Sequence, residues 1–218
     1  MMAASVAVAP VLTGPRRPVE VALVTPSAVY LVAGDDVVCL ATPEAVRVPC
    51  AVVVRRLPVV SVGTIGSIGG GELTLGSFTD RVGRWWRPPR PSLDPASAGD
   101  LLAALDRCEV VLGIDLVGRG PGLTPFGDDV LAGALVTLRA LASPRASSLA
   151  SAVVGQLHRT TVVSAALLRH AARGECIPEL AAVLAPSAAA LPALLAVGHS
   201  SGRGLAQGVR AGLSGGVR

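Results

Sequence analysis

Residues 118–129, GRGPGLTPFGDD, constrain the fold of this chain more than any other stretch. Four glycines and two prolines precede an acidic pair, Asp128 and Asp129. Glycine lets the backbone take positive φ and approach a ligand closely, whereas proline fixes φ and removes a hydrogen-bond donor. This pattern predicts a shaped loop, and such loops often serve ligands. The apolar residues 130–141 predict a buried helix whose first turn carries both aspartates, and residues 108–117 predict a short buried strand or extended stretch before the loop.

The rest of the C-terminal half also has helical patterns. Residues 97–107 and 187–197 each predict a helix, and 146–173 predict one helix or two, ended by Gly174. In a helix His158, Thr161 and Ala165 would share one face, as would Thr160, Ser164 and Leu168. Such hydroxyls either bond carbonyls of their own helix or line a pocket.

The N-terminal half has strand patterns instead. Valine-rich runs between residues 19 and 66 are separated by turn residues and predict antiparallel strands, with a hairpin turn at 33–36. The glycines at 69–71 invite comparison with a phosphate loop, which would need a helix directly after it. Because residues 72–75 look like another strand, a hairpin turn or flexible loop is the favoured interpretation.

Residues 80–95 contain both tryptophans, Trp85 and Trp86, among four arginines and a cluster of prolines. Tryptophan and arginine often anchor interfaces, so the stretch is either an anion site or subunit contact, or a tryptophan pair capping the core before an irregular linker. The prolines mark the domain boundary. The expected organisation is a flexible N-terminus (1–18), a β-rich region (19–95) and an α-helical region (96–218). The predicted fold class is α+β, with the β-rich half packed on the α-helical half.

Composition excludes several classes of function. All 19 basic residues are arginine, so a P-loop lysine, a Schiff-base lysine and a lysine general base are absent. The four cysteines form no C-x-x-C pair and the three histidines are scattered, so neither a zinc site nor a disulfide framework is expected. The arginines are dispersed without interleaved aromatics, which disfavours nucleic-acid binding despite the net charge of +4. No apolar run reaches the ~20 residues of a membrane span, and no signal peptide is evident, so a cytoplasmic protein is expected.

A second glycine-rich turn, Gly198-His-Ser-Ser-Gly-Arg-Gly204, follows one predicted helix and precedes another apolar segment. Small residues with hydroxyls and free amides at a helix start can receive an anion. The simpler interpretation is a helix–helix turn with Ser200 or Ser201 as N-cap. His199 is the candidate acid or base, since it alone of the histidines lies beside a glycine turn.

Three segments together resemble a bacterial family that includes the small third subunit of the oxamate carbamoyltransferase of anaerobic allantoin breakdown. They are the loop at 118–129, similar to the family's G-x-G-x-G-L-T-P-S-G-D-D, the stretch Thr161–Gly174, and the turn Gly198–Gly202. The first motif is long and specific. Two departures stand out: Phe126 replaces the loop serine, and Arg203-Gly204 follows the turn where the family has any residue and then Asp. The resemblance covers about the last half of the chain closely.

The resemblance implies carbamoyl transfer on a small nitrogenous or carboxylate substrate, with an anionic small molecule bound and with partner subunits or a homo-oligomer. A transferase that uses carbamoyl phosphate needs hydrogen-bond donors that bind the phosphate group. It also needs donors that polarise the carbonyl group in the transition state. Asp128 and Asp129 could orient a nitrogen nucleophile, accept its proton or hold Mg²⁺, or they could satisfy only the helix N-terminus. The alternative function is a non-catalytic subunit that binds a metabolite. The predicted catalytic residues are Asp128, Asp129 and His199, and the predicted substrate-binding residues are Arg119, Gly120, Gly122, Thr124, Gly127, Thr161, Ser164, Ser200 and Ser201.

Overall fold

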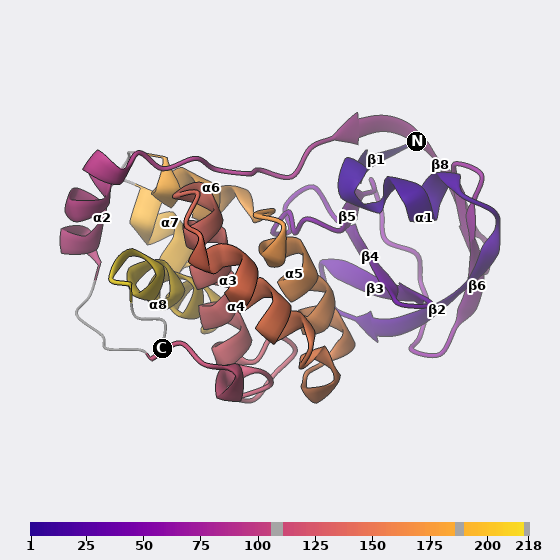
Figure 1. Cartoon of the computed structure of the whole chain (residues 1–218). Coiled ribbons are helices and arrows are strands. Elements are labelled where there is room, and N and C mark those ends of the chain that lie inside the picture. The colour runs from indigo at the N-terminus through magenta and orange to yellow at the C-terminus, as the bar shows by residue number, and fades with distance from the viewer. Residues whose placement is uncertain (106–110, 186–189, 216–218) are drawn as a thin grey trace. The chain divides into compact units, whose positions relative to one another are not determined.

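The computed structural model describes residues 1–105, 111–185 and 190–215. The chain divides into two compact units, Met1–Pro88 and Pro89–Arg218 (Figure 1). The division falls within the proline cluster, a few residues before the boundary expected at residue 95. Strands fill the first unit and helices the second, so the predicted α+β class is confirmed at the level of its two halves.

The first unit is a closed barrel, which the sequence analysis did not foresee. Its strand order is β1-β5-β4-β3-β2-β6-β7-β8. Closure leaves no unpaired sheet edge, and the inward-facing side chains fill the interior. Valine, leucine and isoleucine dominate that interior, among them the fully buried Leu31, Leu40, Ile68 and Leu73. The strands are β1 (Met2–Ser5), β2 (Arg17–Val24), β3 (Ala28–Ala33), β4 (Asp36–Ala41), β5 (Ala51–Val53), β6 (Ile65–Gly69), β7 (Glu72–Leu75) and β8 (Phe78–Trp86).

Both predicted hairpin turns are present. Strands β3 and β4 pair antiparallel up to Ala33 and Asp36, and β6 and β7 pair up to Gly69 and Glu72. Gly70 and Gly71 have φ of 62° and 80°, which glycine adopts at no steric cost. The expectation of antiparallel strands between residues 19 and 66 is wrong at one place, because β4 pairs with β5 in parallel. Outside that range, β1 and β8 also pair in parallel.

The N-terminal residues, expected to form a flexible segment at 1–18, contain regular elements. Strand β1 pairs with both β5 and β8 and so closes the barrel. It leads into the 3₁₀ helix η1 (Val6–Val8) and the short helix α1 (Ala9–Thr13), where Val11 and Leu12 are buried. The amide of Gly71 donates to the carbonyl of Leu12. The segment is fixed by strand pairing and by this apolar burial.

The tryptophan pair ends strand β8. Trp85 is 39% exposed, so it does not cap the core. Trp86 lies beneath Arg47, whose guanidinium carbon is 5.5 Å from the ring centroid, a cation–π arrangement. The irregular segment that follows Trp86 agrees with the predicted linker.

The helical unit is built around α3 (Phe126–Ala140), as the sequence predicted, with Asp128 and Asp129 in its first turn. Helix α3 is buried along nearly its whole length. The other elements are the 3₁₀ helices η2 (Pro95–Ser97), η3 (Ile114–Leu116) and η4 (Leu157–Arg159), and the helices α2 (Ala98–Ala104), α4 (Arg145–Val154), α5 (Val162–Ala172), α6 (Pro178–Leu184), α7 (Leu191–Leu195) and α8 (Ser201–Leu213). No helix among the described residues is long and apolar enough to span a membrane.

Two local predictions in this unit change. The described part of 108–117 begins extended, with Leu112 buried, but continues into η3, where Ile114 is exposed; residues 108–110 lie outside the described residues. Residues 146–173 form two helices, which was one of the two predicted alternatives, because α4 ends at Val154 and η4 intervenes. The helix predicted at 187–197 is shorter in the structure, where it is α7 (Leu191–Leu195). Residues 187–189 of the predicted range lie outside the described residues.

Helices α3 and α8 approach so closely that their contact depends on glycine. In α8 the glycines at 204, 208 and 212 recur every four residues and therefore form one ridge. A Cβ at Gly208 would lie 2.1 Å from the carbonyl oxygen of Val130, and one at Gly204 would lie 2.7 Å from Cβ of Asp129. The ridge thus carries the N-terminus of α8 onto the first turn of α3.

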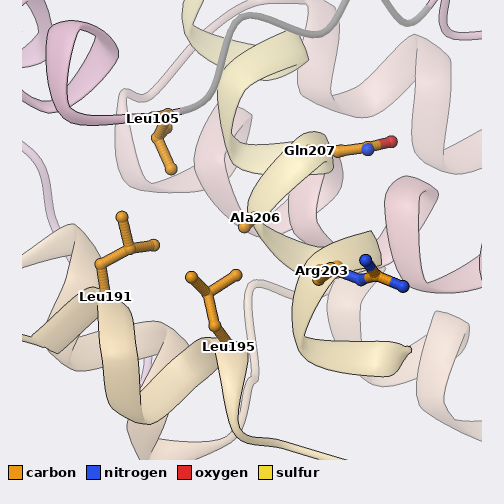
Figure 2. A pocket seen from close by; sticks show the side chains of 6 residues that line it. All are labelled: Leu105, Leu191, Leu195, Arg203, Ala206 and Gln207. Carbon is orange, nitrogen blue, oxygen red and sulfur yellow. The ribbon is translucent and has the colours of Figure 1, made fainter. Parts of the chain in front are cut away.

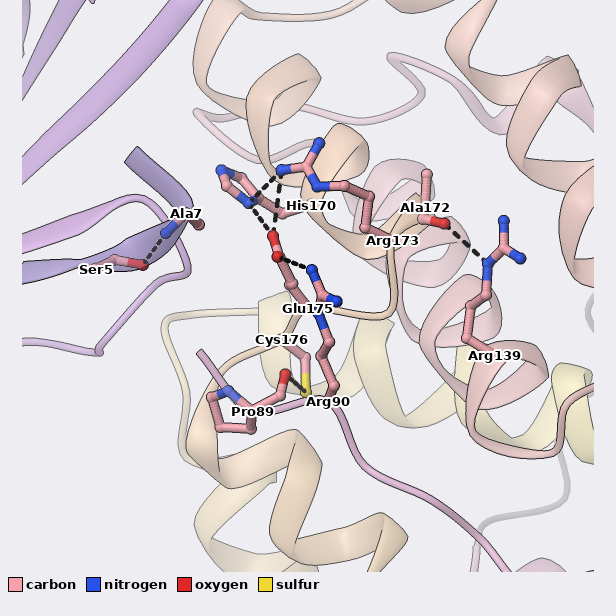
Figure 3. Close-up of polar contacts among 10 residues, drawn as sticks. All are labelled: Ser5, Ala7, Pro89, Arg90, Arg139, His170, Ala172, Arg173, Glu175 and Cys176. Atoms are coloured by element: carbon pink, nitrogen blue, oxygen red, sulfur yellow. Dashed lines mark hydrogen bonds and ion pairs between the residues drawn. The ribbon is translucent and has the colours of Figure 1, made fainter. Parts of the chain in front are cut away.

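Glu175 anchors the segment after the linker to the end of α5 (Figure 3). Its carboxylate accepts from Arg90 at 2.5 Å, lies 2.6 Å from Nδ1 of His170 and pairs with Arg173 at 3.2 Å. The loop forms because Gly174 takes a φ of 78° just after α5, the predicted glycine ending. Burial alone would raise the pKa of Glu175, but the hydrogen bonds from His170 and Arg90 and the charge of Arg173 outweigh burial and hold it at about 2.

Glu175→Gln should therefore destabilise the helical unit at neutral pH. The folded pKa lies below the ordinary value of 4.5, so the stabilisation is fully present above pH 4.5 and disappears as the pH falls through about 2. We expect a loss of about 2–3 kcal/mol in the free energy of unfolding at pH 7 and little difference from the parent chain near pH 2. Urea unfolding at several pH values measures both. Glu44→Gln, which removes an exposed carboxylate, is the control, and an equal loss at every pH would contradict the ionic origin.

Candidate functional site

Hydrogen bonds join the loop at 118–125 to the first turn of α3. The amide of Gly118 donates 2.8 Å to Oδ1 of Asp128, and the amide of Gly127 donates 2.9 Å to the carbonyl of Arg119. The amides of both aspartates donate to the carbonyl of Pro125. These bonds fold the loop back over the first turn of α3. Between described residues, no hydrogen bond uses the amides of Gly120, Gly122, Leu123 or Thr124.

Asp128 is the buried centre of this arrangement, at 1% exposure. Besides the Gly118 amide, it accepts from the hydroxyl of Ser164 at 2.7 Å and from the hydroxyl of Thr160, both on Oδ2. Its two oxygens therefore have three donors. Asp128 joins the loop, the start of α3 and the start of α5. Its predicted catalytic role stays a prediction.

The hydroxyls near α5 reach the site by a different route from the predicted one. Thr160 and Thr161 precede α5, so the expected helical faces do not form there. Thr161 is the N-cap: its Oγ1 accepts from the amide of Ser164 and donates 2.6 Å to the carbonyl of Leu123. Of the predicted hydroxyl residues, Ser164 contacts an acidic residue of the site and Thr161 contacts the loop. Thr160, which was not predicted to be a site residue, is brought to Asp128 by the turn after η4.

Asp129 faces the other side, toward α8. The side chains of Thr124 and Ser201 lie beside it, and their hydroxyl oxygens are 2.9 Å apart. Asp129 is 7% exposed, and its Oδ2 is buried without a hydrogen-bond partner among the described residues. Burial, with a smaller contribution from the charge of Asp128, raises the pKa of Asp129 to about 7, while the Thr124 and Ser201 hydroxyls oppose the shift. A carboxyl group with this pKa can exchange a proton near neutral pH.

The remaining predicted residues lie at the rim of the site or outside it. Arg119 is 71% exposed at its side chain and pairs with Asp115 at 3.6 Å, so it does not face the two aspartates. His199 is exposed in the turn before α8, and Ser200 is the half-buried N-cap position of α8. Gly127 is required for packing, because a Cβ there would lie 2.2 Å from the carbonyl oxygen of Leu116. The predicted substrate-binding role of Arg119 and of the loop glycines stays a prediction.

The Mg²⁺ site considered from the sequence stays a prediction, and the geometry limits the aspartate ligands it could use. Mg²⁺ prefers oxygen ligands in an octahedral arrangement. Both oxygens of Asp128 already accept from amide and hydroxyl donors, which leaves only Asp129 to offer a free oxygen. Among the described residues there is also no group of three or more histidine, cysteine, aspartate or glutamate side chains that could hold a metal.

A small hollow of about 90 Å³ lies on another side of α8 (Figure 2). Leucines from the end of α2 and from α7 form its apolar part, while Arg203 and Gln207 extend away from those leucines. None of the predicted site residues lines it. Its lining consists of Leu105, Leu191, Leu195, Arg203, Ala206 and Gln207.

Every residue of the aspartate site falls within one stretch of the chain, from the loop to the start of α8. Residues 116–213 match the family model of oxamate carbamoyltransferase subunit AllH. The resemblance predicted from the sequence is confirmed over these residues, all of which lie in the helical unit. No curated protein and no solved structure matches the chain.

Phe126 and Gly204, two positions singled out in the sequence, lie together. A Cβ at Gly204 would lie 3.4 Å from Cδ2 of Phe126 and 2.7 Å from Cβ of Asp129. Phe126 and Gly204 therefore meet at one point, beside Asp129. The glycines that recur every four residues in α8 are a sequence signal for this contact, which was not predicted.

Proposed function

We propose that the helical unit holds the small-molecule site of a carbamoyltransferase-type enzyme, with Asp129 as its proton acceptor. The unpartnered, buried oxygen of Asp129 beside the Thr124–Ser201 hydroxyl pair is the observation that carries the proposal. The AllH match supports carbamoyl chemistry, since that family is a subunit of oxamate carbamoyltransferase.

In this reaction a substrate nitrogen attacks the carbonyl carbon of carbamoyl phosphate. A C–N bond forms, the C–O bond to phosphate breaks, and phosphate leaves with the electron pair. Asp129 takes the proton that the nitrogen loses, and the hydroxyls of Thr124 and Ser201 hold that nitrogen in place. The loop amides at 120 and 122–124, with Arg119 and Ser200 at the rim, are the proposed donors to the anionic substrate. His199 is the second proposed proton-transfer group, and it would give a proton to the leaving phosphate.

The test is phosphate release from carbamoyl phosphate in the presence of oxamate or small amines, with and without the other subunits of the transferase. Asp129→Asn should lower kcat by about 10²–10⁴, the usual contribution of a positioned general base. Asp115→Asn, which alters an exposed aspartate near the same loop, should leave kcat unchanged. Full activity of Asp129→Asn would remove Asp129 from the mechanism.

Because AllH is one subunit of oxamate carbamoyltransferase, one alternative is a chain that binds a metabolite and supports catalytic partners. In that case the isolated chain turns nothing over, and Asp129→Asn in the assembled enzyme raises KM while kcat stays the same. A kcat effect in the assembled enzyme would instead favour the catalytic role.

A further inference from the structure

The immediate surroundings of Asp129 favour one kind of ligand. A buried acceptor without a donor costs about 1–3 kcal/mol, so the site is completed by a group that donates a hydrogen bond to it. The two neighbouring hydroxyls can each accept as well as donate. The site therefore offers one carboxylate and two hydroxyl oxygens to the same incoming group.

The charges around Asp129 indicate that this group is positive. The charge that acts on Asp129 is that of Asp128, which repels a second negative charge. The cationic side chains on the adjoining elements face elsewhere: Arg119 pairs with Asp115, Arg159 donates to the carbonyl of Ile114, and Arg203 lines the hollow of Figure 2. On the turn before α8, His199 is exposed. No described cation neutralises the site.

We infer that Asp129, Thr124 and Ser201 bind the ammonium form of a small primary amine through its N–H groups. This inference rests on the proposed function and names the substrate class of that site: the nitrogen that receives the carbamoyl group. The anionic carbamoyl donor would then be held by other groups, because two aspartates repel it. The same carboxylate both attracts the ammonium group and can accept its proton to give the nucleophilic amine.

Phe126 and Gly204 limit the size of the amine. Gly204 packs against Asp129 and adds no second carboxylate, while the ring of Phe126 presents carbon to the same point. A short alkyl group can contact that ring, whereas a second charged group on the ligand would lie against carbon. Ammonium and methylammonium therefore fit better than a diamine or an amino acid.

The inference is tested by binding, independently of turnover. Thermal unfolding of the full chain is followed at pH 8 against ammonium, methylammonium, tetramethylammonium and potassium chlorides at equal ionic strength. We expect a saturable rise in Tm with the first two salts and none with tetramethylammonium, which has no N–H group, or with potassium. Asp129→Asn should abolish the rise and Ser201→Ala should reduce the apparent affinity about tenfold, while the control Asp115→Asn retains it.

Three outcomes would overturn the inference. An equal rise with potassium would indicate a monovalent-metal site, and a rise retained in Asp129→Asn would place the ligand elsewhere. No rise in Tm with any amine would mean that a proton, rather than a ligand, occupies the unpartnered oxygen of Asp129. If turnover is normal yet no amine binds, the proposed amine subsite is wrong and the proposed transferase function is retained. If amines bind without turnover, the amine subsite is retained and the proposed transferase function is wrong. Apparent affinity should also increase from pH 6 to pH 8, as Asp129 loses its proton.

Discussion

Asp129→Asn is expected to stabilise the helical unit at pH 8 by about 2–3 kcal/mol while it removes catalysis. The pKa of Asp129 is raised from its ordinary value of 3.8 to about 7 by burial and by repulsion from Asp128. A raised folded pKa means that the folded state holds its proton more tightly than the unfolded state does. The contribution of Asp129 to stability is thus full below pH 3.8 and is lost as the pH rises through 7, at about 1.4 kcal/mol per pKa unit.

The pH profile separates this effect from an ordinary packing change. Asparagine has the shape of aspartate but no charge, so the variant should gain stability at pH 8 and nothing at pH 4. Urea unfolding of the two proteins at both pH values measures the difference. A variant that is less stable at pH 8 would show that the ionised carboxylate is well solvated or paired, and would contradict the burial of Asp129. A site that sacrifices stability for an ionisable group is a common feature of functional centres.

The parts of this site that could be predicted from the sequence are those formed by residues close together in the chain. The glycine- and proline-rich loop, the acidic pair in the first turn of α3 and the glycine that ends α5 are local features, and each is confirmed. The resemblance carried by the same motifs is confirmed over 116–213. Local patterns could not show that the two aspartates have opposite environments. Asp128 is satisfied by groups from the loop and α5, while Asp129 meets α8, some 70 residues later in the chain.

The fold was predicted less completely for the same physical reason. Valine-rich runs and paired glycines identify strands and hairpins, but barrel closure depends on pairing β1 with β8, which are far apart in the chain. Residues 1–18 lacked a strong strand pattern, and pairing with two neighbours fixes β1 nonetheless. Likewise, the spacing of Thr160 and Thr161 is compatible with a helix. Thr161 is instead the N-cap, where its hydroxyl accepts a hydrogen bond from an amide that would otherwise lack a partner.

Gly208→Ala should strongly destabilise the helical unit. The added Cβ would lie 2.1 Å from the carbonyl oxygen of Val130, 2.7 Å from the amide nitrogen of Ala134 and 2.9 Å from Cα of Gly133. All three are backbone atoms, so no side chain can rotate away, and α8 must move off α3. We expect a loss of about 3 kcal/mol in the free energy of unfolding.

Gly99→Ala is the matched control, since it makes the same change in α2, where an added Cβ meets nothing within 4 Å. There the change should stabilise by about 0.5–1 kcal/mol, because alanine loses less conformational freedom than glycine in a helix. Calorimetry of both variants measures the contrast, which should be about 10 °C or more in Tm. If Gly208→Ala were as stable as Gly99→Ala, the close contact of α3 with α8 would be wrong. The placement of Ser201 beside Asp129 would be lost with it, because the same glycine ridge brings the start of α8 to the carboxylate.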